Sequence, residues 1–164
     1  MNGDKLKLDE IDLRILAILQ DDGRITNAKL ASEVGLSAPP ILERVKKLER
    51  AGIIKGYRAI LNAEALGCHF LVFVAVTVDV RQLSRIEAFE EMLVQSREVV
   101  ECHHIAGNID FLLKVRVKDQ QHYKKFVAEH LAKIEGISSL VSWVALHTSK
   151  ETRGLPIPAQ VNGS

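Results

Sequence analysis

Residues Thr26–Gly52 constrain the fold of this chain more than any other stretch, because they combine a glycine turn with a diproline and a helical apolar pattern. Gly35 can end one helix in the left-handed conformation, and Ser37 can cap the next helix with its hydroxyl. Pro39 and Pro40 fit only in the first turn of a helix, where the backbone N–H groups have no partner within the helix. The stretch therefore predicts two short helices joined by a tight turn.

The second of these helices has one apolar side and one charged side. Residues 41–58 contain six basic residues and two acidic ones, which gives a local charge of +4 in a chain whose net charge is +1. A helix held by its apolar side, with a cationic outer side, fits the major groove of DNA. A charge this small predicts that a single copy binds DNA weakly. The inward stripe consists of Ile41, Leu42, Val45 and Leu48, and the outward side chains are those of Glu43, Arg44, Lys47 and Arg50.

The segment before this motif completes a three-helix unit. Leu8–Gln20 repeats apolar residues at helical spacing, and Asp9 is in position to cap that helix. Ile53–Leu61 has the composition of a strand. We therefore expect a winged-type helix-turn-helix domain over residues 1–52, followed by a strand linker over residues 53–66.

After Gly67 the pattern changes to strands that alternate with helices. The order of these elements is β-α-β-β-α-β, which is the arrangement of ferredoxin-like folds, so the fold class of the whole chain is α+β. The strands are expected at Phe70–Val80, Val99–Ile105, Phe111–Val117 and Ile137–His147, and the helices at Leu83–Ser96 and residues 119–134.

The ferredoxin-like domain spans residues 67–150, and residues 151–164 form an irregular C-terminal tail. The two helices of such a domain cover only one face of its sheet. The other face is apolar too, whether Val72, Val74 and Val76 or the residues that alternate with them lie on it. We therefore expect a second copy of the chain to cover that face, which makes the protein a homodimer.

The composition argues against several classes of protein. No run approaches the ~20 apolar residues that cross a bilayer, and the polar N-terminus lacks the apolar segment of a signal peptide. Two cysteines, Cys68 and Cys102, are too few for a disulfide framework. We expect a cytoplasmic protein that does not bind membranes.

The sequence has no recognisable catalytic or metal-binding pattern. Cys102, His103 and His104 are consecutive, and successive strand residues face opposite sides, so the three side chains do not converge on one metal ion. No Ser/His/Asp or Cys/His set has a catalytic context, and no glycine-rich phosphate loop is present. We therefore expect no catalytic residues, no metal and no cofactor, in a protein that is not an enzyme.

A short turn, Gly107-Asn108-Ile109-Asp110, lies between two predicted strands. Glycine and asparagine tolerate positive φ, and aspartate often stands at the end of a loop. Local chemistry alone therefore favours a hairpin turn over a binding site.

Four stretches of the chain resemble the Lrp/AsnC family of bacterial and archaeal transcription regulators. LDEIDLRILAILQDDGRI at 8–25 looks like the opening helix of that family, and LASEVGLS at 30–37 looks like the turn of its motif. ERVKKLERAGIIKGYRAILN at 43–62 is similar to its recognition helix and linker. ECHHIAGNIDFLLKV at 101–115 is similar to its strand-turn-strand signature around Gly-x-x-Asp. The resemblance covers most of the chain and implies that the second domain is of the RAM type.

The resemblance also implies where partners bind. Groove contacts fall within the second helix of the motif, and an amino-acid effector binds at the Gly107–Asp110 turn, between dimers. Backbone N–H groups of the turn could bind the effector carboxylate, and Asp110 could accept from its ammonium. The implied DNA-binding residues are Ser37, Pro39, Pro40, Glu43, Arg44 and Lys47, and the implied effector-binding residues are Gly107, Asn108, Ile109, Asp110, His104, Gln120 and Trp143.

The identity of the effector stays open. Many relatives carry Asp where this chain has Asn108, and that exchange removes one negative charge. His104 and Trp143 are bulky and polar for a leucine pocket, so an aromatic, basic or polar effector is also compatible with the resemblance.

These features together predict a sequence-specific DNA-binding transcription regulator whose DNA binding or oligomeric state responds to a small effector, an amino acid. The resemblance implies dimers that assemble into larger rings, often octamers, so the expected partners are double-stranded DNA, the effector and further copies of the chain. Two alternatives stay open: an architectural DNA-binding protein without an effector, and a small dimeric enzyme, because ferredoxin-like domains also host oxygenase and haem chemistry.

Overall fold

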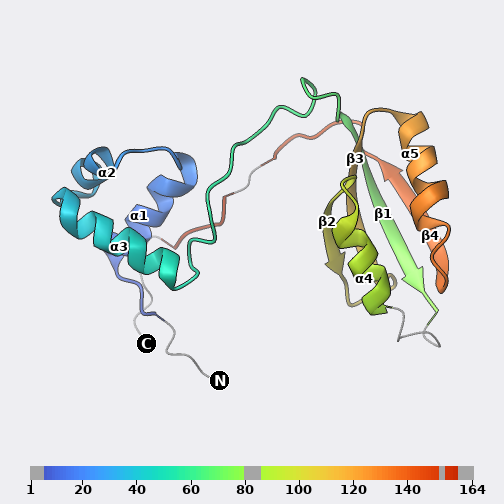
Figure 1. The fold of residues 1–164 in the computed structure, drawn as a ribbon, viewed down its shortest axis with the longest axis horizontal. Helices are drawn as coiled ribbons and strands as arrows, with labels where there is room; N and C mark the ends of the chain where they lie inside the picture. Colours follow the sequence, from blue (N-terminus) through green and yellow to red (C-terminus); the bar gives the residue numbers. More distant parts are fainter. Residues whose placement is uncertain (1–5, 80–85, 152–153, 159–164) are drawn as a thin grey trace. The chain divides into compact units, whose positions relative to one another are not determined.

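The computed structural model describes residues 6–79, 86–151 and 154–158, which form two compact units (Figure 1). The first unit contains the residues up to Ile60 together with the C-terminal segment from Glu151, and the second contains Leu61–Lys150. The first unit has the helices α1 (Glu10–Asp21), α2 (Asn27–Val34) and α3 (Ala38–Arg50). The second has β1 (Phe70–Val78), α4 (Ile86–Gln95), β2 (Val99–His104), β3 (Phe111–Val117), α5 (Gln120–Phe126), a π-helical turn (Val127–Leu131) and β4 (Ile137–Val144).

The first unit is a bundle closed by apolar side chains from all three helices. Ile15 of α1, Leu30 of α2 and Ile41 of α3 are 0% exposed and belong to one cluster. Burying a side chain of this size contributes about 2 kcal/mol to folding. The predicted three-helix unit is confirmed.

A cap and a glycine turn set the ends of these helices. Asp9 Oδ1 accepts from the Asp12 N–H at 2.8 Å, and Asp12 Oδ2 accepts in return from the Asp9 N–H at 3.2 Å. At the end of α2, Gly35 has φ 80°, and the Leu36 N–H reaches the Ala31 carbonyl at 2.9 Å. This left-handed step satisfies the last carbonyls of α2 and leads the chain into α3, as the sequence predicts.

Ser37 stands at the N-cap of α3, but its hydroxyl bonds no backbone N–H of the helix. An N-cap side chain bonds the N–H of the second or third helical residue, and here those residues are Pro39 and Pro40, which have none. The predicted hydroxyl cap is therefore wrong. The prolines do lie in the first turn of the helix, as the sequence predicts, and the helix begins at Ala38.

An ion pair joins α1 to α3. Arg44 Nη1 lies 2.7 Å from Asp9 Oδ2 and 2.7 Å from Asp12 Oδ1. Asp12 is buried, and a buried carboxylate needs a partner because it has lost its hydration. The hydrogen bond to Asp9, followed by that to Asp12, raises the pKa of Arg44. The prediction that Arg44 points outward is wrong, because both carboxylates hold a side chain that is only 30% exposed.

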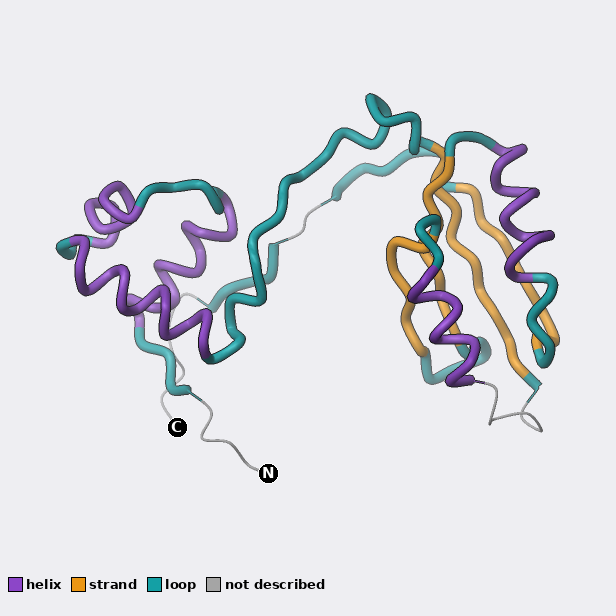
Figure 2. The backbone as a smooth tube through the Cα atoms, viewed as in Figure 1, coloured by secondary structure: helices purple, strands orange, loops and turns teal. Residues whose placement is uncertain are grey.

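The segment that follows α3 differs from the prediction. Gly52 ends the helix with φ 68°, as expected, but Ile53–Leu61 contains no strand. Figure 2 draws the stretch between α3 and β1 as loop. A strand needs a neighbouring strand to bond its N–H and C=O groups, and the described part of this chain offers that segment none.

The second unit is an antiparallel sheet with the strand order β2-β3-β1-β4. Val72, Val74 and Val76 of β1 are buried in one cluster with Phe89 of α4 and Phe126 of α5, so both helices cover the same face (Figure 1). The order and the single covered face are those of the ferredoxin-like arrangement, which confirms the predicted α+β fold.

Among the described residues of the second unit, the opposite face of the sheet carries apolar side chains that are partly exposed. Phe73 of β1 lies opposite Trp143 of β4, and Ala75 lies opposite Val141. Val141 is 45% and Trp143 52% exposed. We call Phe73, Val141 and Trp143 the open apolar face. Of the two alternatives that the sequence leaves, the residues alternating with the buried valines lie on it.

The ends of several elements also differ from the sequence pattern. The predicted positions 80 and 83–85 lie outside the described residues. Asp119 caps α5 as expected, because its Oδ1 accepts from the His122 N–H at 2.9 Å. The α-helical geometry ends at Phe126, however, and the Ala132 N–H then bonds the Val127 carbonyl at 2.8 Å in a wider π-helical turn.

The C-terminal segment packs on the first unit through Gln20. The Leu155 N–H donates to Gln20 Oε1 at 2.8 Å, and Gln20 Nε2 donates to the Leu155 carbonyl at 2.9 Å. A Cβ on Gly154 would lie 2.8 Å from Gln20 Nε2, so a side chain there would displace the amide. The chain thus leaves the first unit, forms the second and returns, without a helix or strand in the described part of the tail.

We expect Arg44→Met to lower the free energy of unfolding of the first unit by about 2–3 kcal/mol, because it leaves the buried Asp12 carboxylate without its cation. Urea denaturation followed by circular dichroism measures the loss. Lys47→Met is the matched control, and its effect should stay within about 0.5 kcal/mol because Lys47 is exposed. Equal losses in the two variants would contradict a stabilising role for the ion pair.

Candidate functional site

The outer side of α3 is the candidate nucleic-acid interface. The buried stripe of the helix, which is Ile41, Val45 and Leu48, packs on α1 and α2. Successive residues are rotated by roughly 100° about a helix axis, which identifies the side chains opposite this stripe. These exposed side chains, which we call the α3 ridge, are Pro39, Glu43, Lys46 and Arg50.

The charges along this ridge are mixed. Lys46 Nζ lies 3.4 Å from Glu43 Oε1, one turn away. Arg50 Nε donates to the Lys46 carbonyl at 3.3 Å. Lys47 lies beside the ridge and has no hydrogen-bond or ion-pair partner among the described residues, so its charge is available to a phosphate. With Arg44 held by Asp9 and Asp12, fewer cations face outward than the local charge of +4 suggests.

The start of α3 is a weak phosphate site. A helix N-terminus binds phosphate through the free N–H groups of its first turn. Pro39 and Pro40 occupy that turn and have no N–H. Contacts from this end of the helix therefore depend on side chains and on the apolar surface of the prolines.

Most of the DNA-binding residues implied by the resemblance are exposed on the motif, whereas Arg44 is half-buried and bonded to Asp9 and Asp12. Lys46 and Arg50 lie on the ridge but were not among the implied contacts. The sequence pattern places Leu42 in the inward stripe, but Leu42 is 36% exposed. Because the predicted inward side was shifted toward Leu42, the predicted outward side was shifted away from Lys46. The exposed implied residues are Ser37, Pro39, Pro40, Glu43 and Lys47.

The turn between β2 and β3 is the candidate effector site. The Ile105 N–H bonds the Asp110 carbonyl at 2.8 Å, and the Asp110 N–H bonds the Val76 carbonyl at 2.9 Å. Asp110 Oδ2 accepts from the Val78 N–H at 2.7 Å, so one carboxylate oxygen fastens the turn to β1. Within the described residues, nothing bonds the N–H groups of residues 106–109. Such a run of free N–H groups can bind a carboxylate.

The other implied effector residues do not meet at this turn within one chain. His104 faces the helices and stacks on Phe111, with ring centroids 4.8 Å apart. Trp143 lies on the opposite face of the sheet, across from Phe73. Gln120 begins α5 after the far end of β3, and a strand of that length spans about 20 Å. The implied site is therefore not formed by one chain.

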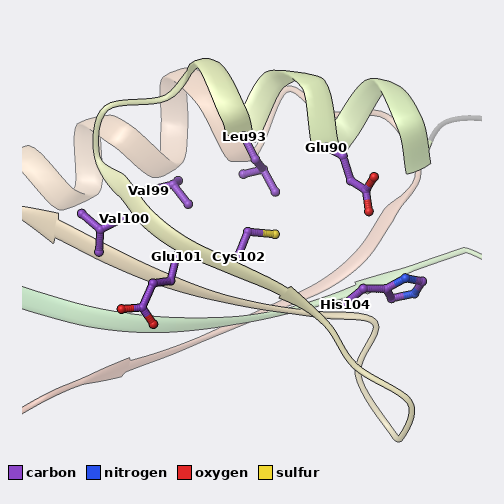
Figure 3. A pocket seen from close by; sticks show the side chains of 7 residues that line it. All are labelled: Glu90, Leu93, Val99, Val100, Glu101, Cys102 and His104. Carbon is purple, nitrogen blue, oxygen red and sulfur yellow. The ribbon is translucent and has the colours of Figure 1, made fainter. Parts of the chain in front are cut away.

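A hollow of about 370 Å³ lies between α4 and β2, one of the two edge strands of the sheet (Figure 3). Figure 3 shows Leu93 and Glu90 hanging from α4, with Cys102 pointing up toward Leu93 and Glu101 pointing away from the helix. Burial, followed by the charge of Glu90, raises the pKa of the Cys102 thiol. His104 also lines this hollow, but the turn at residues 107–110 does not.

The described residues hold no group of three or more His, Cys, Asp or Glu side chains arranged to bind a metal ion. None of their helices combines the length and the apolar character that a membrane crossing requires.

Two family models match this chain, one over each unit. Residues 8–55 match the winged helix-turn-helix DNA-binding model. Residues 71–155 match the Lrp/AsnC ligand binding domain, which is more than half of the chain. The first match contains the α3 ridge, and the second contains the turn between β2 and β3.

Known proteins are similar to this chain over nearly its whole length. The chain is 41% identical to the leucine-responsive regulatory protein of Escherichia coli over 150 residues, which are 92% of either chain. A transcriptional regulator of Neisseria meningitidis in complex with L-Met is 33% identical, with a TM-score of 0.88 over 92% of this chain and 97% of that one. An AsnC family regulator of Agrobacterium tumefaciens is 35% identical, with a TM-score of 0.87 over 91% and 97%.

These relatives are transcription regulators, which confirms the expectation that the chain is not an enzyme. The helix-turn-helix unit and the ligand-binding domain occur here in the same order and over the same span. The chain belongs to the Lrp/AsnC family of transcription regulators.

Proposed function

We propose that the α3 ridge enters the major groove and that the chain regulates transcription by binding DNA at specific sequences in the cytoplasm. The observation that carries this proposal is the geometry of α3, which buries one stripe and presents the opposite side, with Lys46 and Lys47, to solvent. Ridge side chains contact base edges, and Lys47 contacts a phosphate. Ser37, Pro39 and Pro40 approach the duplex at the start of the helix.

In this proposal Arg44 positions the reading helix instead of touching DNA. Its guanidinium is already bonded to Asp9 and Asp12 at 2.7 Å each, and releasing it would leave Asp12 as a buried unpaired charge. Nη1 makes both bonds, so a phosphate contact would have to use Nη2 or Nε of a side chain that is only 30% exposed. The cations of α3 that can contact DNA without leaving a buried charge unpaired are Lys46, Lys47 and Arg50.

We propose a homodimer formed through the open apolar face, as the basis of larger rings such as octamers. Phe73, Val141 and Trp143 form this face, and exposed apolar patches of this kind mark protein contacts. A dimer carries two reading helices, which allows it to bind both halves of a pseudo-palindromic site. Because the two reading helices are linked, the dimer binds DNA more tightly than either copy does alone.

We propose that an amino-acid effector binds at the Gly107–Asp110 turn, between copies of the chain. The free N–H groups of residues 106–109 suit its carboxylate. Asp110 Oδ1 suits its ammonium, because Oδ2 is already bonded to the Val78 N–H. His104, Gln120 and Trp143 lie apart in one chain, so they contribute to one site only if different copies supply them.

Effector binding at such an interface changes which arrangement of copies is favoured. The arrangement sets the spacing of the reading helices, so the effector and DNA are coupled through assembly. The L-Met complex of the Neisseria meningitidis relative makes an amino acid the first class of ligand to test.

Lys47→Ala should weaken binding to a selected duplex by a similar factor for every sequence and lower the salt slope of log affinity by about 1, because one phosphate contact is lost. Fluorescence anisotropy at several salt concentrations measures both quantities. Lys124→Ala, an exposed lysine of α5, is the control and should leave the slope unchanged. An unchanged salt slope for Lys47→Ala would show that Lys47 does not contact a phosphate.

Trp143→Glu should shift the protein toward monomers in sedimentation velocity, because a charge would be buried at the centre of the proposed dimer contact. Gln121→Glu places the same charge on exposed α5 and should leave the sedimentation coefficient unchanged. A Trp143→Glu variant that stays folded and dimeric would show that the copies meet elsewhere.

Isothermal titration calorimetry with each of the twenty amino acids should identify at least one effector, and Asp110→Asn should weaken its binding about tenfold or more. Asparagine keeps an acceptor for the Val78 N–H but removes the charge that faces the ammonium. Asp119→Asn, the same change at the cap of α5, should have no effect on affinity. If none of the twenty amino acids binds, the result would favour an architectural DNA-binding protein.

A further inference from the structure

Glu43 is the single carboxylate of the α3 ridge. It lies one turn from Pro39 and one turn from Lys46, near the middle of the outer side. Its side chain is 67% exposed. The other glutamate of the helix, Glu49, lies beside the ridge and accepts from the Tyr57 hydroxyl at 3.1 Å. Glu43 is therefore the acceptor that a docked duplex meets first.

A carboxylate in this position opposes DNA binding in general. Every phosphate repels it, and no cation of the described residues bonds it tightly, because Lys46 Nζ remains 3.4 Å away. Arg44 is adjacent in sequence but is held by Asp9 and Asp12 on the buried side. Glu43 gains a favourable contact only where the duplex presents a hydrogen-bond donor.

The major groove presents such donors on two bases. Cytosine shows its N4 amino group, and adenine shows its N6 amino group beside the acceptor N7. Guanine shows two acceptors and thymine one acceptor and a methyl group. A carboxylate accepts only, so it is repelled by N7 and the oxo groups and favours cytosine.

Resting on the function proposed above, we propose that Glu43 is a specificity-determining residue that selects cytosine in each half-site by accepting from its N4 amino group. Lys46 leaves Glu43 on docking and moves to a phosphate, which exposes both carboxylate oxygens to the base edge. Lys46 thus adds affinity without regard to sequence, while Glu43 penalises every other base at its position.

The test is DNA selection with the full-length chain, followed by affinities for the selected duplex and for each single-base replacement. The wild-type chain should require one cytosine per half-site, and replacing it should weaken binding about tenfold or more. Glu43→Gln should change the preferred base at that position to adenine, because glutamine bonds N6 and N7 together. Glu43→Ala should bind all four bases with similar affinity there, while bases at other positions are still discriminated.

Two control variants separate this role from a general charge effect. Glu49→Gln removes the same charge beside the ridge and should keep the wild-type preference for cytosine. Lys46→Gln should weaken binding to all duplexes by a similar factor and keep that preference as well. Circular dichroism checks that each variant has the wild-type helix content.

The outcomes distinguish this inference from the proposed function. If Glu43→Gln and Glu43→Ala change affinity but keep the wild-type preference at every position, Glu43 does not select a base and the inference is overturned alone. If the wild-type chain binds no duplex even at low salt, the proposed function fails and this inference fails with it.

Discussion

The pairing of the buried Asp12 carboxylate with Arg44 is the interaction on which the DNA-binding part of the molecule depends. Burial of Ile41, Val45 and Leu48 attaches α3 to the bundle and turns the opposite, charged side of the helix to solvent. The bonds from Arg44 to Asp9 and Asp12 are directional and short. They add a directional link between α1 and α3 to the packing that already turns the α3 ridge outward.

The use of Arg44 inside the unit changes the electrostatics outside it. Lys46, Lys47 and Arg50 remain as outward cations of α3, and Glu43 partly offsets Lys46. A surface with so few available charges gains little affinity from phosphates alone. In the proposed dimer, affinity comes from linking two copies and specificity from the few groups that reach base edges. The proposal thus links assembly to base reading.

The second unit meets the requirements of assembly through its sheet. One face is buried under α4 and α5, and the open apolar face is the one that we propose another copy covers. The turn at residues 107–110 is fastened to β1 by Asp110, and the N–H groups of residues 106–109 have no partner among the described residues. Because His104 and Trp143 lie on opposite faces, a site that uses both requires more than one chain. This requirement is what would couple effector binding to assembly.

The sequence by itself determined the three helices, the glycine turn at Gly35, the order of helices and strands along the second domain and the family, because local spacing and caps depend on neighbours along the chain. It did not reveal that Arg44 pairs with Asp12 or that Ser37 has no N–H to cap beside two prolines. It also placed a strand at Ile53–Leu61, where the chain has no partner strand. Only the tertiary structure decided these points, because an ion pair between residues 32 positions apart, the free side of a helix and the pairing of a strand depend on which segments meet in space.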